Sequence, residues 1–298
     1  MLKRHIHTLP MFALATAGCL WGTGFFFGKI ALTEMPVPSM VLFRFAFACA
    51  GLFPVIFYNR PHFVGSEWGW VLVASVLGVP VQYLVQFKGL SLTTVSHASL
   101  MVGTLPMLLA VAAVMFGGER LHFSGWLALA ASTFGAALIA LSSSRAAGAA
   151  VASTMGDLLV VLSMFGAIAW ILISKHLMQR HSPMIVTAFV FWVGTVMLAV
   201  TVMTTSGIPS LHYSTRAWIA VVEQGLLATA STALLWNWGL KRVPASQAGI
   251  FVNLEPLVGA ILGVSLLHES LGIMAVVGGA LIIGGAVYFS YKPEKSRL

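Results

Sequence analysis

The strongest constraint in this sequence is an internal duplication. The stretch Gly239–Glu269 repeats the stretch Gly89–Glu119 at an offset of 150 positions (239 − 89 = 150). Residues 68–136 align with residues 218–286 without a gap, and 17 of the 69 aligned positions are identical. An ungapped self-match of this length predicts a chain built from two copies of one structural unit.

The solvent around both copies is predicted from the scarcity of charge. The 298 residues are 59% hydrophobic and only 8% charged, whereas a soluble domain carries about 25% charged residues. A chain with so few charges cannot cover its surface for water. We therefore expect an all-α integral membrane protein, in which lipid surrounds most of the chain.

Apolar runs long enough to cross a bilayer as helices divide the chain further. About 20 apolar residues are needed to cross roughly 30 Å of hydrocarbon. Ten such runs are present, which predicts ten transmembrane helices. They lie at about 10–30, 38–58, 68–87, 95–116, 122–142, 156–175, 183–206, 215–238, 244–266 and 271–291.

The linker at 142–155 divides the ten runs into two halves, 1–145 and 146–298. Five spans is an odd number, so the second half is expected to enter the membrane from the opposite side. Lys and Arg concentrate in cytoplasmic loops, and both chain ends are then predicted to be cytoplasmic. This orientation places 11 basic residues inside (Lys3, Arg4, Arg60, Arg120, Lys175, Arg180, Lys241, Arg242, Lys292, Lys295, Arg297) and 4 outside (Lys29, Lys88, Arg145, Arg216).

Inverted repeats of this kind are typical of secondary transporters, whose two halves meet at a binding site near the membrane midplane. Because the basic residues flank apolar runs, the net charge of +8 indicates membrane orientation and not nucleic-acid binding. We find no phosphate-binding loop and no HExxH or GxSxG motif, so neither ATP-driven transport nor an enzyme is expected. No cofactor and no metal site are expected.

Several matched features resemble the drug/metabolite transporter superfamily, and within it the ten-helix EamA-type exporters, over nearly the whole chain. They are Trp21-Gly22 with Lys29, Arg44, the turns Gly118-Glu119-Arg120 and His268-Glu269, and the pair Pro106/Pro256. Within this group the chain resembles the YddG-type bacterial aromatic amino-acid exporters. The resemblance implies an exporter of amino acids in a bacterial inner membrane; a cationic-drug or other metabolite exporter of the same fold is the alternative.

Aromatic and amide side chains inside the spans are candidates for lining a central chamber. Tyr83 and Gln86 lie three residues apart and share a helix face, and Trp236 is the repeat mate of Gln86. Trp21 and Trp170 occupy similar places in spans 1 and 6. Such a chamber suits an amphiphilic solute with an apolar side chain. The alternative for tryptophans is the aromatic belt at the membrane interface.

Ionisable residues within spans are costly and usually face a cavity or a partner helix. Glu255, in Asn253-Leu254-Glu255-Pro256, is expected to exchange a proton or to bind a substrate ammonium; the alternative is a carboxyl that steadies helix packing. Glu223 would join it as a counter-ion for a cationic drug. Arg44 is a candidate for attracting a substrate carboxylate; the alternatives are snorkelling to the membrane interface and pairing with the C-terminus of a helix.

A final group of candidates comes from the repeat itself. His97 and Gln247 are repeat mates, and Pro106 and Pro256 each remove a helical backbone bond, so they predict bent helices and a gate. The alternatives are hydrogen bonding between helices and static kinks. The complete set expected to bind substrate is Trp21, Tyr83, Gln86, His97, Met101, Trp170, Trp236, Gln247, Asn253 and Glu255, with Arg44 for the carboxylate and Pro106 and Pro256 for gating.

Overall fold

The computed structural model describes residues 2–58, 63–93, 98, 101–146, 153–267 and 273–291, and over these ranges the chain forms helices and turns without a β-strand. His97 lies outside the described residues, and so do Ser96 and the turn His268-Glu269. Each of the ten apolar runs contains helix. That the chain is all-helical is confirmed, whereas the exact number of spans stays a prediction.

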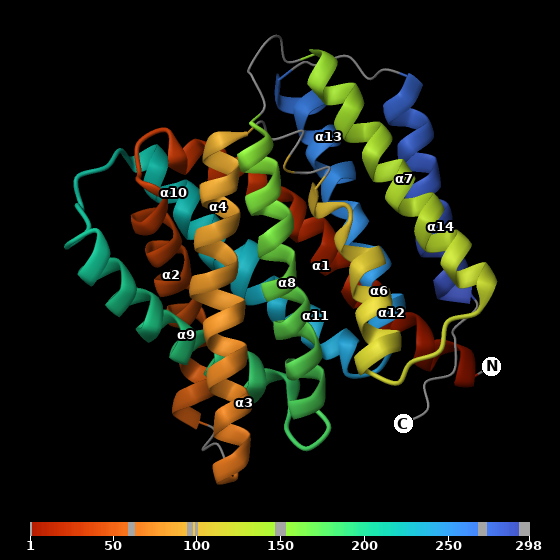
Figure 1. Cartoon of the computed structure of the whole chain (residues 1–298), viewed down its shortest axis with the longest axis horizontal. Helices are drawn as coiled ribbons and strands as arrows, with labels where there is room; N and C mark the ends of the chain where they lie inside the picture. The colour runs from red at the N-terminus through yellow and green to blue at the C-terminus, as the bar shows by residue number, and fades with distance from the viewer. Residues whose placement is uncertain are drawn as a thin grey trace.

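The first half contains long helices and one divided helix (Figure 1). Gly65–Leu92 is continuous but includes a short π-helical turn, in which backbone bonds join residues five apart. The elements are α1 (Leu2–Leu32), α2 (Val37–Tyr58), α3 (Gly65–Val76), the π turn η1 (Leu77–Val81), α4 (Gln82–Leu92), α6 (Leu105–Phe116) and α7 (Phe123–Ala146).

The second half follows the same order. Its eighth apolar run also contains a π turn, and its ninth is divided by a 3-10 turn. The elements are α8 (Thr154–Leu177), α9 (Pro183–Thr205), α10 (Thr215–Gly225), the π turn η2 (Leu226–Ser231), α11 (Thr232–Leu240), α12 (Ala245–Ala248), the 3-10 turn η3 (Gly249–Asn253), α13 (Leu254–Leu267) and α14 (Ile273–Tyr291).

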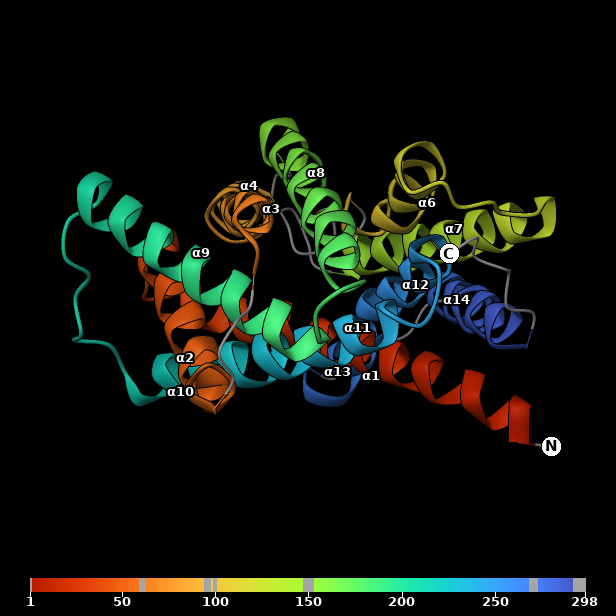
Figure 2. The same ribbon diagram turned by 90° about the horizontal axis from the view of Figure 1, so that it is seen from below.

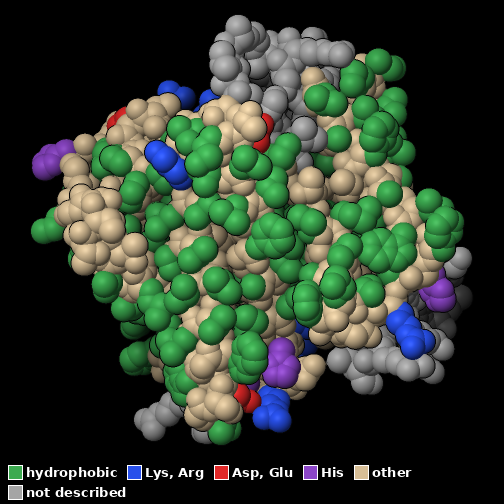
Figure 3. All heavy atoms as spheres, in the orientation of Figure 1, with side chains coloured by type: hydrophobic (Ala, Val, Ile, Leu, Met, Phe, Trp, Pro, Cys, Tyr) green, Lys and Arg blue, Asp and Glu red, His purple; other side chains and the backbone are tan. Residues whose placement is uncertain are grey.

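Length and hydropathy mark six helical segments among the described residues as able to cross a membrane: Leu9–Leu32, Val37–Tyr58, Gly65–Leu92, Thr154–Leu177, Pro183–Thr205 and Thr215–Leu240. Leu105–Phe116, Phe123–Ile139 and Val276–Tyr291 are shorter apolar helices. In Figure 3 the visible charged side chains lie toward the upper and lower parts of the molecule. Between them the surface is hydrophobic or uncharged, as a lipid-facing band requires.

The two halves pack by crossing over. The first helix of each half packs against the third and fourth apolar runs of the other: α1 contacts α10, α11 and α13, while α8 contacts α3, α4 and α6. The second helices cross in the same way, with α2 against η2 and α9 against η1. The last helices of the two halves, α7 and α14, lie side by side (Figures 1 and 2). Neither half therefore buries its own apolar faces alone.

Glycines at repeat-related positions allow these crossings. A Cβ on Gly89 in α4 would lie 2.8 Å from the carbonyl oxygen of Gly156 in α8, and one on Gly239 in α11 would lie 2.7 Å from the side chain of Leu14 in α1. A Cβ on Gly194 in α9 would lie 2.6 Å from Val79 in η1. Small residues at such contacts are what close helix packing in membranes requires.

A buried carboxylate also ties the halves together. The Glu119 carboxylate, in the turn after α6, accepts hydrogen bonds from Lys175 Nζ at 2.9 Å and from the backbone N–H groups of Ala245 at 2.7 Å and Ser246 at 3.0 Å. The Ser246 hydroxyl donates to it as well, at 2.7 Å. Lys175 completes the cluster by donating to the Val243 carbonyl at 2.8 Å. Glu119 thus fixes the end of α8 against the start of α12.

Opposing effects set the protonation of this carboxylate. Burial by itself would raise the pKa of Glu119. The Lys175 ammonium and the hydrogen bonds from Lys175 and Ser246 together outweigh burial and hold the pKa below its ordinary value of 4.5. Because the folded pKa is the lower one, the carboxylate contributes stability above pH 4.5, and this contribution is lost as the pH falls through the lowered pKa.

We predict that Gly194→Ala destabilises the protein by about 1–3 kcal/mol, because the new methyl group overpacks the contact between α9 and η1. The midpoint of thermal unfolding in detergent should fall. Gly69→Ala in α3 is the matched control. Nothing lies within 4 Å of its Cβ position, so the midpoint should stay or rise slightly. Equal losses in both variants would contradict the close-packing argument.

We predict that Glu119→Gln costs about 3 kcal/mol, because it leaves the Lys175 ammonium, only 16% exposed, without its carboxylate. Unfolding midpoints measured across a pH series should show the gap between wild type and variant closing as the pH falls below about 4.5. The double variant Glu119→Gln/Lys175→Gln should recover part of the loss. A gap that widens in acid would show that Glu119 does not act as a carboxylate here.

Candidate functional site

The helices that form the centre of the molecule are interrupted at matching positions of the two copies. In the fourth run, Met101 and Val102 are helical, Gly103 and Thr104 form a turn, and α6 begins at Leu105. In the ninth run, η3 ends at Asn253 and α13 begins at Leu254. Interrupted helices at membrane depth are tolerated where they face protein or a cavity. They are typical of transporter binding sites.

Two prolines lie at these interruptions. Pro106 and Pro256 were expected to bend helices and to form a gate. Pro106 occupies the first turn of α6, and Pro256 the first turn of α13. Proline is well accommodated there, because the first-turn N–H groups have no partner within the helix. Each proline lies where a new helical segment starts, and a bend of the chain at either point stays a prediction. A gating role stays a prediction.

A cavity of about 600 Å³, counting the space at its mouth, lies at these two interruptions. Its walls come from both halves, and its lining includes two pairs of repeat mates, Val102/Val252 and Leu105/Glu255. The lining residues are Trp21, Gly24, Arg44, Gln82, Tyr83, Gln86, Phe87, Val102, Leu105, Met164, Ala167, Trp170, Ile171, Val252 and Glu255.

Six side chains that sequence analysis proposed for a chamber line this cavity: Trp21, Arg44, Tyr83, Gln86, Trp170 and Glu255. They lie on α1, α2, α4, α8 and α13, and these helices belong to both halves of the chain. Glu255 is buried. No hydrogen bond to its carboxyl is found in the part of the chain that the structure describes.

Four other candidates lie elsewhere. Trp236 is fully buried behind Trp21, with their ring centroids 4.9 Å apart. Asn253 donates to Ser132 in α7 at 2.9 Å. Gln247 is buried within α12, and Met101 packs against the hydrophobic core. None of these four is among the residues lining the cavity. A direct substrate contact for them has no support in this conformation.

The two π turns lie at repeat-related positions. Adding 150 to η1, residues 77–81, gives 227–231, which falls within η2 at 226–231. The hydroxyl of Thr229 in η2 donates to the carbonyl of Gln224 at 2.7 Å, and that of Thr232, the first residue of α11, donates to the carbonyl of Leu227 at 2.7 Å. These side chains satisfy carbonyl oxygens in the widened turn. Single π turns inside α-helices are frequent at functional sites.

Arg44 is fixed on η2. Its Nε donates to Thr229 Oγ1 at 2.7 Å, one terminal nitrogen donates to Gln224 Oε1 at 2.6 Å, and the other makes a longer contact of 3.4 Å with the Ala228 carbonyl. The guanidinium lies over the ring of Tyr83, 4.7 Å from its centroid. With 4% exposure, this side chain does not snorkel to the interface. That interpretation is wrong.

Gly194 in α9 occupies the crossing that corresponds to that of Arg44 in α2, but the two side chains differ. On one side Gly225, just before η2, lets the backbone of α2 approach at Arg44; on the other, Gly194 lets α9 approach Ser75, just before η1. The positions correspond, since 75 + 150 = 225. The copies therefore share a crossing geometry, but only the crossing at η2 carries a charge.

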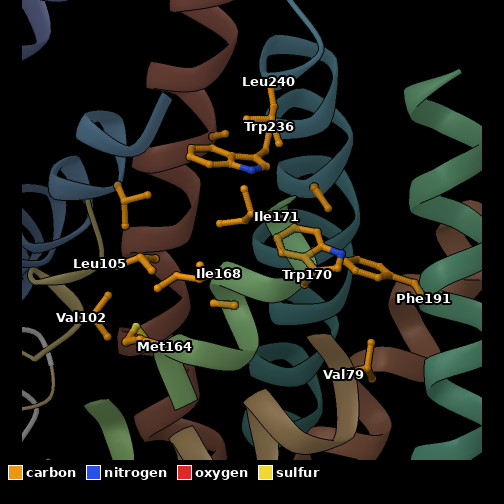
Figure 4. Close-up of a cluster of buried hydrophobic side chains, with 14 of the residues drawn as sticks. Val79, Val102, Leu105, Met164, Ile168, Trp170, Ile171, Phe191, Trp236 and Leu240 are labelled. Carbon is orange, nitrogen blue, oxygen red and sulfur yellow. The ribbon is translucent and has the colours of Figure 1, made fainter. Parts of the chain in front are cut away.

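Apolar walls separate the charged part of the cavity from the helices behind it. Trp170 stacks on Phe191, with centroids 6.1 Å apart, and it packs on Gly78 in η1, where a Cβ would lie 2.7 Å from the indole. Figure 4 shows Trp170 beside Phe191 and, across the cluster, Val102, Leu105 and Met164 gathered together. The close approach of Trp170 thus depends on a glycine in the π turn.

Sequence analysis missed several lining residues and the partners of Arg44. The repeat carries a signal for one of them: Leu105 follows from Glu255 by subtracting 150. Gln224 and Thr229 had no such signal, because the repeat mates at 74 and 79 are apolar. Among the described side chains, no group of three His, Cys, Asp or Glu is placed to hold a metal ion.

The fold and the cavity together define a multi-pass helical membrane protein with a central chamber whose lining is mostly apolar and aromatic with a few polar side chains. A family model described as the EamA-like transporter family matches residues 8–141 and again residues 154–291. The two matches cover most of the chain and fall one in each half. The chain belongs to the EamA-like transporter family. It is a membrane transporter, and the resemblance to this family is confirmed.

Relatives of the chain carry the same general description. It is 23% identical over 286 residues to an uncharacterized transporter of Archaeoglobus fulgidus, covering 95% of this chain and 97% of that one. It is 24% identical over 279 residues to the uncharacterized transporter YetK of Bacillus subtilis, covering 92% and 84%. A solved crystal structure with 20% identity aligns with a TM-score of 0.76 over 95% of this chain and 96% of the other. That likeness shows the shared fold.

We predict that Arg44→Lys destabilises the protein by about 2 kcal/mol, because a single ammonium cannot reach both Thr229 and Gln224 and one hydrogen bond of a charged group is lost. Thermal unfolding in detergent measures the effect. Arg216→Lys, at the exposed start of α10, is the matched control and should leave the midpoint unchanged. An unchanged midpoint for Arg44→Lys would show that the guanidinium geometry does not stabilise η2.

Proposed function

We propose that this transporter exports amino acids, aromatic ones included and with broad specificity. The observation that carries the proposal is the presence of a guanidinium and a carboxyl in one aromatic cavity: Arg44 and Glu255 both line it, together with Trp21, Tyr83 and Trp170. A zwitterion with an apolar side chain matches such a lining, because its carboxylate finds a guanidinium, its ammonium finds a carboxyl and its side chain finds ring faces.

In this proposal the substrate carboxylate binds near Arg44. Three N–H groups of the guanidinium are used by Gln224 at the end of α10 and by Thr229 and Ala228 in η2, which leaves two for a carboxylate. The substrate ammonium binds at Glu255, whose carboxyl is buried on the cavity wall. The side chain lies against Trp21 and Trp170. Since Arg44 is held by its other hydrogen bonds, it is oriented before the substrate arrives, and little ordering is needed on binding.

Transport would proceed by alternating access between residues 1–145 and 146–298, taken as two inverted five-helix repeats that make ten spans. The crossed packing of the halves and the position of the cavity at repeat-related interruptions support this scheme. We propose further that the protein lies in a bacterial inner membrane with both chain ends in the cytoplasm. Its proposed specificity is of the YddG type, as the sequence suggests.

The test is flux of radiolabelled phenylalanine into proteoliposomes of the purified protein, with competitors that remove one charge at a time. Tryptophan and methionine should compete. Phenylalaninol lacks the carboxylate and 3-phenylpropionate lacks the ammonium, so each should compete at least about tenfold more weakly, since one charged hydrogen bond contributes about 1.5–3 kcal/mol.

Glu255→Gln should remove the discrimination against 3-phenylpropionate but keep that against phenylalaninol. Glu34→Gln is the matched control. Glu34 lies in the turn after α1, where it accepts hydrogen bonds from Ser214, and it is not among the cavity-lining residues. Phenylalaninol or a quaternary ammonium dye competing better than phenylalanine would overturn the amino-acid proposal in favour of a cationic substrate. So would the absence of phenylalanine flux above empty liposomes.

A further inference from the structure

We propose that Glu223 is a proton-carrying site, separate from the cavity, and that its proton is exchanged during transport. The side chain lies near the end of α10 and faces α1. It is not among the residues that line the cavity. The transport part of this inference rests on the proposed function, whereas the protonation of Glu223 does not.

The hydrogen-bond geometry requires the proton. The Thr23 hydroxyl oxygen lies 2.7 Å from the carbonyl oxygen of Leu20 and 2.6 Å from Glu223 Oε1. A hydroxyl has one proton to donate, and a backbone carbonyl has none. Both contacts are hydrogen bonds only if Thr23 donates to Leu20 and the Glu223 carboxyl donates to Thr23. A carboxylate would leave one close oxygen–oxygen contact without a proton.

The second carboxyl oxygen leads to the same assignment. Glu223 Oε2 is buried and has no hydrogen-bond partner among the described residues. In the described ranges Glu223 also forms no ion pair, since Arg44 is bound to Gln224, Thr229 and Ala228. A buried, unpartnered carbonyl oxygen of a neutral acid is much less costly than a buried, unpaired carboxylate. Both oxygens are therefore compatible with the protonated form.

The charged groups around Glu223 explain what would follow from losing the proton. α10 packs against α1, α2 and η2. The titratable side chains described on these elements are Cys19 and the exposed Lys29 on α1, and Arg44, the buried Cys49 and the exposed Tyr58 on α2.

η2 carries no titratable side chain, and Arg216 at the start of α10 is exposed. Tyr83 and Glu255 influence Glu223 only indirectly, by way of Arg44. The Arg44 guanidinium contacts the Tyr83 ring and lines the same cavity as Glu255. Arg44 is thus the cation that an ionised Glu223 would face.

This arrangement links the proton to the substrate site. Gln224, next to Glu223 in sequence, accepts a hydrogen bond from Arg44. When the Glu223 proton passes to water, the remaining carboxylate competes with Gln224 and Thr229 for the guanidinium. Arg44 then turns from η2 and from the cavity toward Glu223, which weakens its hold on a substrate carboxylate. Protonation restores the arrangement seen here, so one proton is exchanged for each cycle of binding and release.

The protonation is tested by infrared difference spectroscopy of the purified full-length protein in lipid, between neutral and alkaline pH. The carbonyl band of a protonated carboxyl should be present at neutral pH, vanish on alkalinisation, and be absent at both pH values in Glu223→Gln. Glu255→Gln assigns any second band to the cavity. Thr23→Val should shift the Glu223 band, because its acceptor is lost. A neutral-pH band that is unchanged in a folded Glu223→Gln protein overturns the proposal.

The exchange is tested in proteoliposomes by two modes of phenylalanine transport. Glutamine keeps the N–H donor toward Thr23 but cannot lose a proton, so Glu223→Gln should retain counterflow of labelled against unlabelled substrate and lose accumulation driven by a pH gradient. Retained gradient-driven accumulation in Glu223→Gln overturns the coupling. Absence of all amino-acid flux in the wild type contradicts the proposed function alone, because the infrared band still decides whether Glu223 carries a proton.

Discussion

Backbone hydrogen bonds must be satisfied within the protein wherever water is excluded, and this constraint organises the molecule. A continuous helix satisfies it trivially. The fourth and ninth apolar runs do not, because the chain turns at Gly103-Thr104 and at η3. Irregular backbone of this kind is stable only against protein or a polar cavity, so the crossing helices α1 and α8 and the cavity itself lie at these two points.

The duplication provides matched geometry, and the differences between mates provide chemistry. Leu105 and Glu255 occupy corresponding cavity positions, but only one of them can be charged. Arg44 and Gly194 occupy corresponding crossings, with the same contrast. A fully symmetric cavity would offer two like charges or none. The asymmetric one offers a cation and a carboxyl, which is the arrangement that a dipolar solute requires.

Sequence reasoning could predict what depends on periodicity and composition. Apolar runs of membrane length gave helices, and Trp21, Tyr83 and Trp170 were placed in a chamber because aromatic and amide groups inside spans need a partner. It could not place Trp236 or Asn253 on the correct side of their helices, because which face meets the cavity depends on the π turn and on η3. Hydropathy carries no signal for either irregularity.

The environment of Arg44 could not be predicted from the sequence either. Its position in an apolar run is compatible with snorkelling or with burial, and the choice depends on Gln224 and Thr229, about 180 residues away in the chain. The prolines were ambiguous for a related reason. A proline indicates where a helix lacks a bond but not whether the helix continues through that point or begins there.

The π turns have a geometric consequence for the whole cavity. An α-helix advances about 100° around its axis per residue, so one inserted residue rotates everything after it by that angle relative to everything before it. Gly78 in η1 faces Trp170, and Tyr83 and Gln86 just beyond it face the cavity. Without the inserted residue these two sets of contacts would be out of phase. The π turn therefore acts as a phase shift that lets one helix serve its packing partner and the chamber together.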